Sequence, residues 1–592
     1  MKYLLFLILL PSIGFAAAFV PDDPYFDPFT YDGGELYAGQ WHLLNQAPVT
    51  GDSAGLDVNI WEAWSNGFTG AGVIIGIVDD GTQGNHPDLI DNFENDYSWG
   101  FGKDAATNLG ESYRGGPVRS GLGSDGDSHG TSVAGVSAAR GDNGIGMTGA
   151  APYSGIAGLR LINAEDPSGR SFGEIEAAAI LYQGQTDGSG NSNPFVAPSW
   201  DSVPVRVKNH SYGPQEGFQL YPGFDKVVNA LEESASHGVI HVWASGNQRM
   251  TERNPWPTAD ASKSLSGALP ENIIVAALGS DGKYSSYSSY GSSVFVTAPS
   301  SGIDGYGIAT TDRTGSSEGY NKVPSDPDQA LDSPDGYNYT SRFGGTSSAS
   351  PLVAGVMALG VAANPDMDHR MAKHILVSTS RVVDAGDSSS TGRWIVNGAG
   401  NAFNNNYGFG LVDAGAFTET ATRVDRVTEQ TFYSTGEQVV NRSFASEGDD
   451  EISESFVVAV DPAEKQALEY VMVEMTIIGL ETDWNTYEGG SGVSWGTFLP
   501  GLPLPLGLAM SCSSTIEPCR RPIGNCVGII MTTSWIGNLS ATRIGAKMLK
   551  ALGSWNSTMI RAMTLLALCR ITNLPQPWAS SSSFQSRRPM PF

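Results

Sequence analysis

Cysteine is nearly absent from this chain of 592 residues: the four present all lie in its last fifth, at Cys512, Cys519, Cys526 and Cys569. An internal disulfide therefore cannot stabilise the chain before residue 512. Basic side chains are also scarce, with 34 Lys and Arg against 62 Asp and Glu and a formal net charge of −28. This charge argues against nucleic acid as a partner, because phosphate binding needs a basic face.

Long apolar runs are missing after the N-terminus, so we expect no membrane span in the mature protein. The N-terminus itself carries Lys2, the apolar run YLLFLILL and small residues at Ala16 and Ala18. This pattern predicts a signal peptide over residues 1–18, because the run is too short to cross a bilayer. The protein is therefore expected to be secreted or periplasmic. Its length predicts two or more domains.

Strand-like and helix-like segments alternate through the first two thirds of the chain. Apolar runs such as GVIIGIVDDG, IAGLRLI and VIHVWASGN are separated by helical patterns such as GEIEAAAILYQG and FDKVVNALEESASHG. Such alternation predicts an α/β fold with a doubly wound, mostly parallel sheet. Ligand chemistry on these sheets gathers at the carboxyl ends of the strands, which places Asp79 at a functional edge.

Two helix starts carry the remaining chemistry. His129 begins the small-residue segment HGTSVAGVSAA, and Ser347 lies in GTSSASP, directly before the apolar stretch LVAGVMALGVAA. At a helix start, unpaired N–H groups and the positive end of the dipole face whatever the hydroxyl attacks. We expect Pro351 in the first turn, where its missing N–H costs nothing.

Together these residues supply the parts of a nucleophilic site. A Ser hydroxyl needs an imidazole to take its proton, and the imidazole needs a carboxylate to fix its tautomer. Asp79, His129 and Ser347 provide one of each, and Asn247, just after a buried strand in WASGN, could supply an oxyanion donor.

The four motifs IVDDG, HGT, ASGN and GTSSASP match, in order and context, those of the subtilisin-like serine proteases. Within that family the chain resembles the kexin and furin branch, the proprotein convertases. The resemblance rests also on QWHL and YGFGLVDAGA and covers roughly residues 20–420. It implies that Asp79 orients His129, that His129 is general base and then general acid, and that Ser347 forms the acyl-enzyme. Asn247 and the Ser347 backbone N–H are implied to hold the oxyanion.

The resemblance also implies residues that bind substrate. Ser211, Tyr212 and Gly213 match the strand that pairs with extended substrate backbone. Asp80 matches the convertase acid that faces a basic side chain next to the cleavage point. For the deeper acidic pocket the matches are Glu216, which stands near an expected Asp, and Asp260. We therefore expect cleavage after Lys or Arg, with broader specificity as the alternative.

Calcium is implied as a cofactor by the same comparison. Asp23, Asp88 and Asn143 match the convertase site that ties the N-terminal segment, residues 19–60, to the catalytic domain, residues 61–420. Oxygen ligands from separated loops suit Ca²⁺, although Asp and Asn also form turns without any metal. The family also has a second calcium site. This chain has Ser289 at the position of the calcium-binding Glu of that site.

The segment before QWHL holds only about twenty residues beyond the expected signal peptide, fewer than the roughly 40 that a small folded domain needs. Family members use a folded pro-segment as an intramolecular chaperone. We therefore expect folding to rely on a separate chaperone, or on none.

After the catalytic domain, LEYVMVEMTI and LETDW resemble the opening of the convertase P domain, a β jelly roll, over residues 425–485. From residue 486 onward the composition changes to two acidic against nine basic residues. When the codons of residues 543–560 are read in a shifted frame, permissible codon choices encode a segment that resembles the P-domain pattern WGE…GTWxLxxxD. We infer a frameshift, so that residues 486–592 form an aberrant tail; a genuine divergent tail is the alternative.

Three functions remain open. The first is a calcium-dependent secreted endopeptidase of the kexin type acting on polypeptides. The second is a broad-specificity degradative protease with the same fold. The third, of another class, is a non-catalytic surface or binding protein that retains a protease fold.

Overall fold

The computed structural model describes residues 19–27, 29–30, 36–37, 39–46, 54–101, 127–162, 169–190, 193–213, 221–251, 259–264, 267, 269–302, 306–317, 319–321, 337–397 and 399–440, and then 453–456, 467–478, 509–518, 527–536 and 562–572. The expected signal peptide and Glu216 lie outside the described residues. The chain divides into two compact units, residues 1–425 with 492–497, and residues 426–491 with 498–592.

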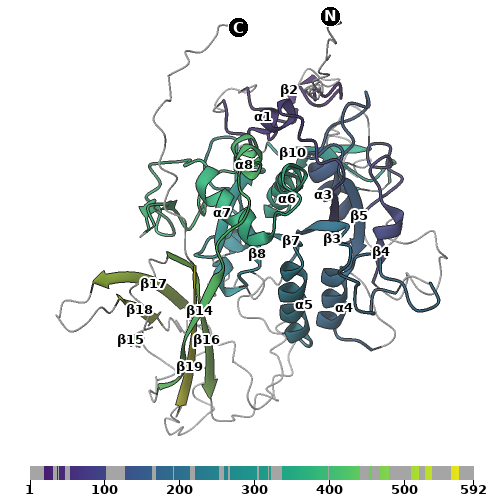
Figure 1. The fold of residues 1–592 in the computed structure, drawn as a ribbon. Helices are drawn as coiled ribbons and strands as arrows, with labels where there is room; N and C mark the ends of the chain where they lie inside the picture. The colour runs from purple at the N-terminus through teal and green to yellow at the C-terminus, as the bar shows by residue number, and fades with distance from the viewer. Residues whose placement is uncertain are drawn as a thin grey trace, which may run out of the picture. The chain divides into compact units, whose positions relative to one another are not determined.

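A parallel sheet of seven strands forms the centre of the first unit (Figure 1). Its strands, in spatial order, are β4 (Trp99–Gly100), β5 (Gly155–Arg160), β3 (Ile74–Asp79), β6 (Val205–His210), β7 (Ile240–Ala244), β8 (Asn272–Leu278) and β9 (Val294–Pro299). The chain adds strands on one side of β3 and then on the other, so β3 lies at the topological switch point, where ligands bind in open α/β sheets. The predicted doubly wound α/β fold is confirmed.

Helices cover both faces of this sheet. The long helices α3 (His129–Ala138) and α6 (Thr346–Ala363) lie together on one face, and α4 (Phe172–Leu181) and α5 (Phe224–Ser236) lie side by side on the other (Figure 1). The remaining helices are α1 (Ile60–Ser65), α7 (His369–Thr379) and α8 (Ala414–Ala421), with short 3₁₀ turns η1 (Asn95–Tyr97), η3 (Gln248–Thr251) and η4 (Ala261–Lys263). Small two-stranded sheets pair β1 (Phe29–Thr30) with β2 (Leu36–Tyr37), β10 (Ile308–Thr311) with β11 (Tyr339–Phe343), and β12 (Ile395–Val396) with β13 (Ala402–Phe403).

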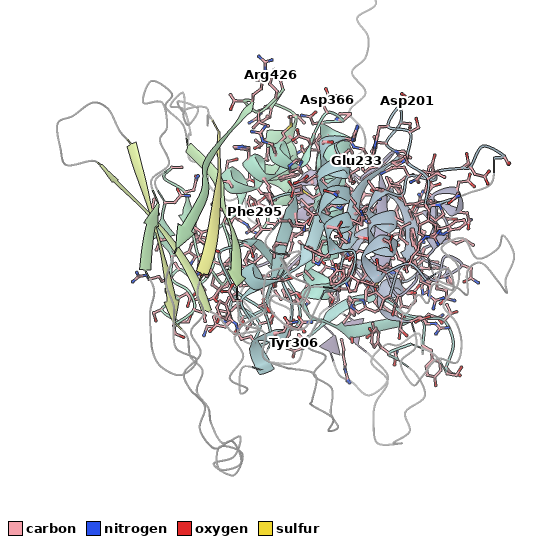
Figure 2. The ribbon with its side chains drawn as sticks, turned by 90° about the horizontal axis from the view of Figure 1, so that it is seen from below. Asp201, Glu233, Phe295, Tyr306, Asp366 and Arg426 are labelled. Atoms are coloured by element: carbon pink, nitrogen blue, oxygen red, sulfur yellow. The ribbon has the colours of Figure 1, made fainter. Side chains whose placement is uncertain are left out.

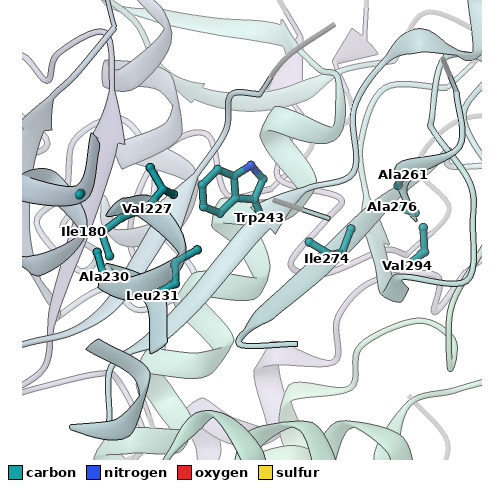
Figure 3. Close-up of a cluster of buried hydrophobic side chains, with 10 residues drawn as sticks. Ile180, Val227, Ala230, Leu231, Trp243, Ala261, Ile274, Ala276 and Val294 are labelled. Carbon is teal, nitrogen blue, oxygen red and sulfur yellow. The ribbon is translucent and has the colours of Figure 1, made fainter. Parts of the chain in front are cut away.

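The apolar core is made by side chains that the sequence pattern places on buried strands and helix faces. Trp243 of β7 lies among Val227, Leu231 and Ile274, between the sheet and the α4–α5 layer (Figure 3). Some acidic side chains lie at the surface, as Asp201, Glu233 and Asp366 do (Figure 2), and they contribute to the negative charge.

α6 is almost entirely buried, which explains its composition. Most of its side chains are small, and a Cβ on Gly355 would lie 2.6 Å from Ala150 Cβ. It is the one helix in the described part of the chain that is long and apolar enough to cross a membrane, and 89% of it is buried inside the protein, as in the core helix of a folded domain. Pro351 is its sixth residue, so our expectation of a first-turn proline was wrong.

The second unit is built from antiparallel strands in two three-stranded sheets. β14 (Gln430–Val440), β19 (Ala562–Thr572) and β16 (Ala467–Ile478) form one, and β15 (Ser453–Phe456), β18 (Val527–Ile536) and β17 (Ala509–Pro518) form the other. Three of these strands come from the predicted aberrant tail. The frameshift stays a prediction, and sequencing the gene across its last hundred or so codons would test it.

Candidate active site

Asp79 and His129 meet at the carboxyl edge of the central sheet. Asp79 is the last residue of β3 and fully buried, and its carboxylate oxygens lie 2.8 and 3.0 Å from His129 Nδ1. His129 is the first residue of α3, and about a quarter of its side chain is exposed. A carboxylate on Nδ1 leaves Nε2 as the reactive nitrogen, which is the arrangement a general base requires.

Charge around the imidazole favours its protonated form. Burial lowers the pKa of His129, but the Asp79 carboxylate outweighs this effect and, with Asp80, raises the pKa to about 9. The Asp79 carboxylate therefore stabilises the protonated form of His129 after a proton has been transferred to it.

Asp80 contacts the same helix by a different route. Its two carboxylate oxygens accept the backbone N–H groups of His129 (3.1 Å) and Gly130 (2.7 Å), so it caps α3 from the end of β3. Only glycine fits at residue 130, because a Cβ there would lie 2.1 Å from Gly81 O. Burial, followed by repulsion from Asp79, raises the pKa of Asp80 to about 7. Its predicted role toward a basic substrate side chain stays a prediction.

Ser347 is the second residue of α6, at a turn made by Gly345. Gly345 has φ 74°, a region that favours glycine, and a Cβ on it would lie 3.0 Å from Asn247 Nδ2. The Asn247 amide oxygen accepts the N–H (2.9 Å) and the hydroxyl (3.1 Å) of Thr346. Both bonds use the oxygen, so the remaining donor of Asn247 is Nδ2, which lies next to Gly345 at the start of α6.

Ser211 connects the segment after β6 to the nucleophile helix. Pro351 has no N–H for the carbonyl of Ser347, four residues earlier, and that carbonyl instead accepts the Ser211 hydroxyl at 3.1 Å. Ser211 Oγ also lies 2.9 Å from Ser350 Oγ, and the Ser347 hydroxyl donates to Ser211 O at 3.3 Å. The interior proline thus frees the carbonyl that holds Ser211 at the site.

The other predicted substrate residues divide into two groups. Tyr212 and Gly213 follow Ser211 in the segment beyond β6, beside the site. Asp260 caps η4, where its Oδ1 accepts the N–H (3.0 Å) and hydroxyl (2.6 Å) of Ser262. Its place in a specificity pocket stays a prediction, as does that of Glu216.

The predicted calcium residues converge on one loop. Asp23 accepts the N–H groups of Asp142 (3.0 Å) and Asn143 (3.4 Å), and the Asn143 amide donates to Asp88 at 3.1 Å. Burial raises the pKa of Asp23 to about 6, with a smaller contribution from the charges of Asp22 and Asp142. Burial also raises the pKa of Asp88 to about 7, with a smaller contribution from the charge of Asp23. Two buried carboxylates of like charge with one amide form a donor set that fits a hard cation. Within the described residues no group of three His, Cys, Asp or Glu side chains could hold a metal, and the calcium site stays a prediction.

The N-terminal segment also docks through polar contacts that the QWHL motif supplies. Gln40 exchanges two hydrogen bonds with the backbone of Thr148 (2.6 and 2.9 Å), and Trp41 Nε1 donates to Gly307 O at 2.9 Å. Tyr25 N donates to Gly146 O at 2.9 Å, next to the predicted calcium loop. Residues 19–46 therefore belong structurally to the first unit.

Several polar residues behind the site were not predicted from the sequence. Glu176, His210 and His241 are buried within hydrogen-bond reach of one another or of Tyr212, and Arg160 pairs with Asp127 (2.8 Å) just before His129. For His210 the signal was the strand VRVKNH, in which Lys208, Asn209 and His210 are all buried and therefore need polar partners.

An Asp–His pair at the end of a parallel strand, with a serine at a helix start that contacts the segment after the neighbouring strand, is typical of serine hydrolases with an α/β fold. The chain belongs to the Subtilase family: the model of that family matches residues 70–410. The predicted subtilisin-like family membership is thus confirmed.

Convertases and a bacterial protease are among the proteins that resemble this chain. Neuroendocrine convertase 2 of Rattus norvegicus is 30% identical over 415 residues, which cover 69% of this chain and 55% of the relative. The Aeromonas extracellular serine protease of Aeromonas sobria is 31% identical over 418 residues, 64% of this chain and 63% of the relative. The chain thus matches just over half the length of these convertase relatives.

Two solved structures share the fold. The serine protease of Aeromonas sobria aligns over 90% of this chain and 88% of its own, with a TM-score of 0.58 and 24% identity. The same enzyme in complex with a chaperone, ORF2, aligns over 90% and 94%, with a TM-score of 0.62 and 22% identity.

Proposed function

We propose that this protein is a secreted, calcium-dependent serine endopeptidase that cleaves polypeptides with Asp79, His129 and Ser347. The observation that carries this proposal is the 2.8 Å contact of the Asp79 carboxylate with His129 Nδ1, at the sheet edge where Ser347 begins α6. Family membership supports peptide hydrolysis as the reaction.

Each group has one task in the proposed reaction. The Ser347 hydroxyl turns from Ser211 O to His129 and attacks the scissile carbonyl carbon, while its proton moves to Nε2. The carbonyl π electrons move to oxygen, and Asn247 Nδ2 with the Ser347 N–H stabilises that oxyanion. Collapse of the intermediate breaks the C–N bond, and His129 returns the proton to the leaving amine. Water then repeats the sequence on the acyl-enzyme.

Calcium has a structural role in this proposal. Asp23, Asp88 and Asn143 would hold the ion, whose positive charge offsets the repulsion between the two buried carboxylates. The N-terminal segment is thereby tied to the loop that follows α3, which carries His129. The ion has no part in bond cleavage.

Removal of calcium should therefore lower stability. A chelator is expected to reduce the free energy of unfolding by about 2.7 kcal/mol relative to calcium at 100 times its Kd, measured as a fall in Tm. Asp88→Asn should abolish this calcium response, and Asp225→Asn, a change at an exposed acid on α5, should keep it. A Tm that ignores chelation in the wild type would contradict the calcium site.

Preference for basic residues is the finer part of the proposal, supported by the convertase relatives and by the match of Asp80, Ser211, Tyr212, Gly213, Glu216 and Asp260. One observation favours the broad-specificity alternative: both Asp80 oxygens are already occupied by backbone N–H groups of α3. Comparing kcat/KM for peptides ending in Lys-Arg and in large apolar residues at the cleavage point separates the two.

A separate folding chaperone is the proposed partner. Support comes from the Aeromonas sobria serine protease, whose structure is known in complex with a chaperone. Export is supported by a relative named as extracellular and by the predicted signal peptide. Full recovery of activity when the purified mature chain refolds alone would rule out the need for a chaperone.

A further inference from the structure

The segment Ser211–Gly213 is held both at Ser347 and from the opposite side, by Trp243. Ser211 O meets the Ser347 hydroxyl at 3.3 Å, whereas Tyr212 O accepts the Trp243 Nε1–H at 2.7 Å. Successive carbonyls of an extended chain point to opposite sides. Contacts that fix Tyr212 therefore determine how Ser211 and Gly213 present their backbone to the site.

The side chain of Tyr212 reaches a buried acid. Its hydroxyl donates to Glu176 Oε1 at 2.9 Å, and the Tyr221 hydroxyl donates to the other oxygen, Oε2. Glu176, on α4, is 1% exposed. A buried carboxylate is costly unless it is hydrogen-bonded, and the two tyrosines supply those bonds. Burial raises the pKa of Glu176 to about 7, against the opposing effect of both hydroxyls.

A chain of buried groups continues from the same hydroxyl. His210 Nδ1 lies 3.2 Å from the Tyr212 hydroxyl, His210 Nε2 lies 3.1 Å from His241 Nδ1, and His241 Nε2 lies 3.0 Å from Ser234 Oγ. Because Tyr212 gives its one proton to Glu176, it must accept from His210 Nδ1–H. His210 Nε2 then accepts from His241 Nδ1–H, and His241 Nε2 accepts from Ser234.

This proton order leaves both histidines neutral. Burial likewise holds the pKa values of His210 and His241 well below the usual histidine range. The His210 ring also stacks on Trp243, with centroids 4.1 Å apart and planes 5° from parallel. Trp243 in turn is fixed in the apolar cluster shown in Figure 3. The network thus joins Tyr212 to α4, α5 and β7. Every hydrogen bond in it is donated in the same direction, from Ser234 toward Glu176.

We propose that Glu176 is a positioning residue for substrate binding, which acts through Tyr212 to hold residues 211–213 in the alignment that pairs with extended substrate backbone. This inference rests on the proposed protease function. Glu176 itself does not contact substrate, since two hydroxyls occupy its oxygens. Its effect should therefore appear only with substrates long enough to pair with the segment.

Two tyrosines on one carboxylate provide a matched experiment. Tyr212→Phe removes the hydroxyl that donates to Glu176 from the segment 211–213. Tyr221→Phe removes the hydroxyl that donates to the other oxygen of Glu176 from the residues just before α5. We expect Tyr212→Phe to raise KM for a tetrapeptide amide roughly tenfold, with little change in kcat, because it loses a hydrogen bond to a charged group. Tyr221→Phe should raise it much less. KM for a single-residue ester, which is too short to pair with the segment, should rise much less than KM for the tetrapeptide in Tyr212→Phe.

Glu176→Gln is the second variant, because it keeps the size of the side chain and removes its charge. It should reproduce the tetrapeptide KM rise of Tyr212→Phe. Labelling of Ser347 by a phosphonylating probe at the wild-type rate verifies that each variant is folded.

The outcomes separate this inference from the proposed function. An active wild type whose variants change KM equally for ester and tetrapeptide, or in which Tyr221→Phe matches Tyr212→Phe, overturns the positioning role alone. A folded wild type that cleaves neither substrate overturns both proposals.

Discussion

The N-termini of α3 and α6 carry His129 and Ser347, and they are capped in different ways. α3 is capped by a carboxylate, since Asp80 takes two of its first N–H groups. α6 is capped by a neutral amide oxygen, that of Asn247, which takes the N–H of Thr346. Neither helix has an acidic residue in its own first turn.

The difference matches what each helix end has to do. Negative charge at α3 compensates its dipole and favours the imidazolium form of His129 during catalysis. Negative charge at α6 would compete with the oxyanion that the same N–H groups must stabilise. A neutral cap therefore satisfies the first amide of α6 and keeps the rest of that helix end available to substrate.

The largest effect should come from removing the nucleophile or its base. Ser347→Ala and His129→Ala are each expected to lower kcat by about 10⁶-fold, the magnitude known for the equivalent changes in subtilisin. The double variant should lose little more, because the two residues act as a unit. Additive losses, measured with a tetrapeptide amide, would show that they do not act together.

The next effect tests the neutral cap of α6. Asn247→Leu should lower kcat by about 10²–10³-fold with little change in KM, a range known from subtilisin. Asn247→Asp keeps the size of the side chain and an oxygen for Thr346, yet it places negative charge at the oxyanion. Its kcat should therefore fall at least as far as that of the Leu variant. Wild-type kcat in the Asp variant would contradict the comparison of the two helix ends.

A smaller effect tests the charged cap of α3. Neutral His129 is the active form, so kcat/KM should rise with pH through the His129 pKa of about 9. Asp80→Asn removes one of the carboxylates that raise this pKa, so the rising limb should move to lower pH. The lost cap should also cost about 1 kcal/mol of stability.

Asp368→Asn is the matched control for that change. Asp368 caps α7 through Met371 N at 2.7 Å, and α7 carries none of the candidate site residues. It should lower Tm by a similar amount and leave the pH profile in place. If both variants shift the profile equally, the effect of Asp80 is not electrostatic.

The fold and the main site residues were predictable because the relevant signals are local. Asp79 ends a buried apolar run, and His129 and Ser347 begin small-residue helices, so strand ends and helix starts place all three at one sheet edge. The parallel sheet follows from the alternation of the same segments. These predictions need only short-range patterns.

Contacts between distant segments were not predictable in the same way. From the sequence, Asp80 was predicted to bind substrate. Its capping of α3 depends on contacts with the backbone of His129 and Gly130, which lie 49 and 50 positions further along the chain. Glu176 looks like an ordinary helix residue until Tyr212 and Tyr221 are brought to it. Pro351 was predicted in the first turn of its helix. The helix in fact begins at Thr346, so the proline is its sixth residue and lies in the second turn.

Covalent labelling with a serine-directed phosphonylating probe tests the central claim most directly, since it asks whether Ser347 is activated by the Asp79–His129 pair. Peptide mapping of the folded protein should find the label on Ser347, and His129→Ala should label far more slowly. A folded wild type that stays unlabelled, or a His129→Ala variant that reacts at the wild-type rate, would contradict the account and favour a non-catalytic binding protein.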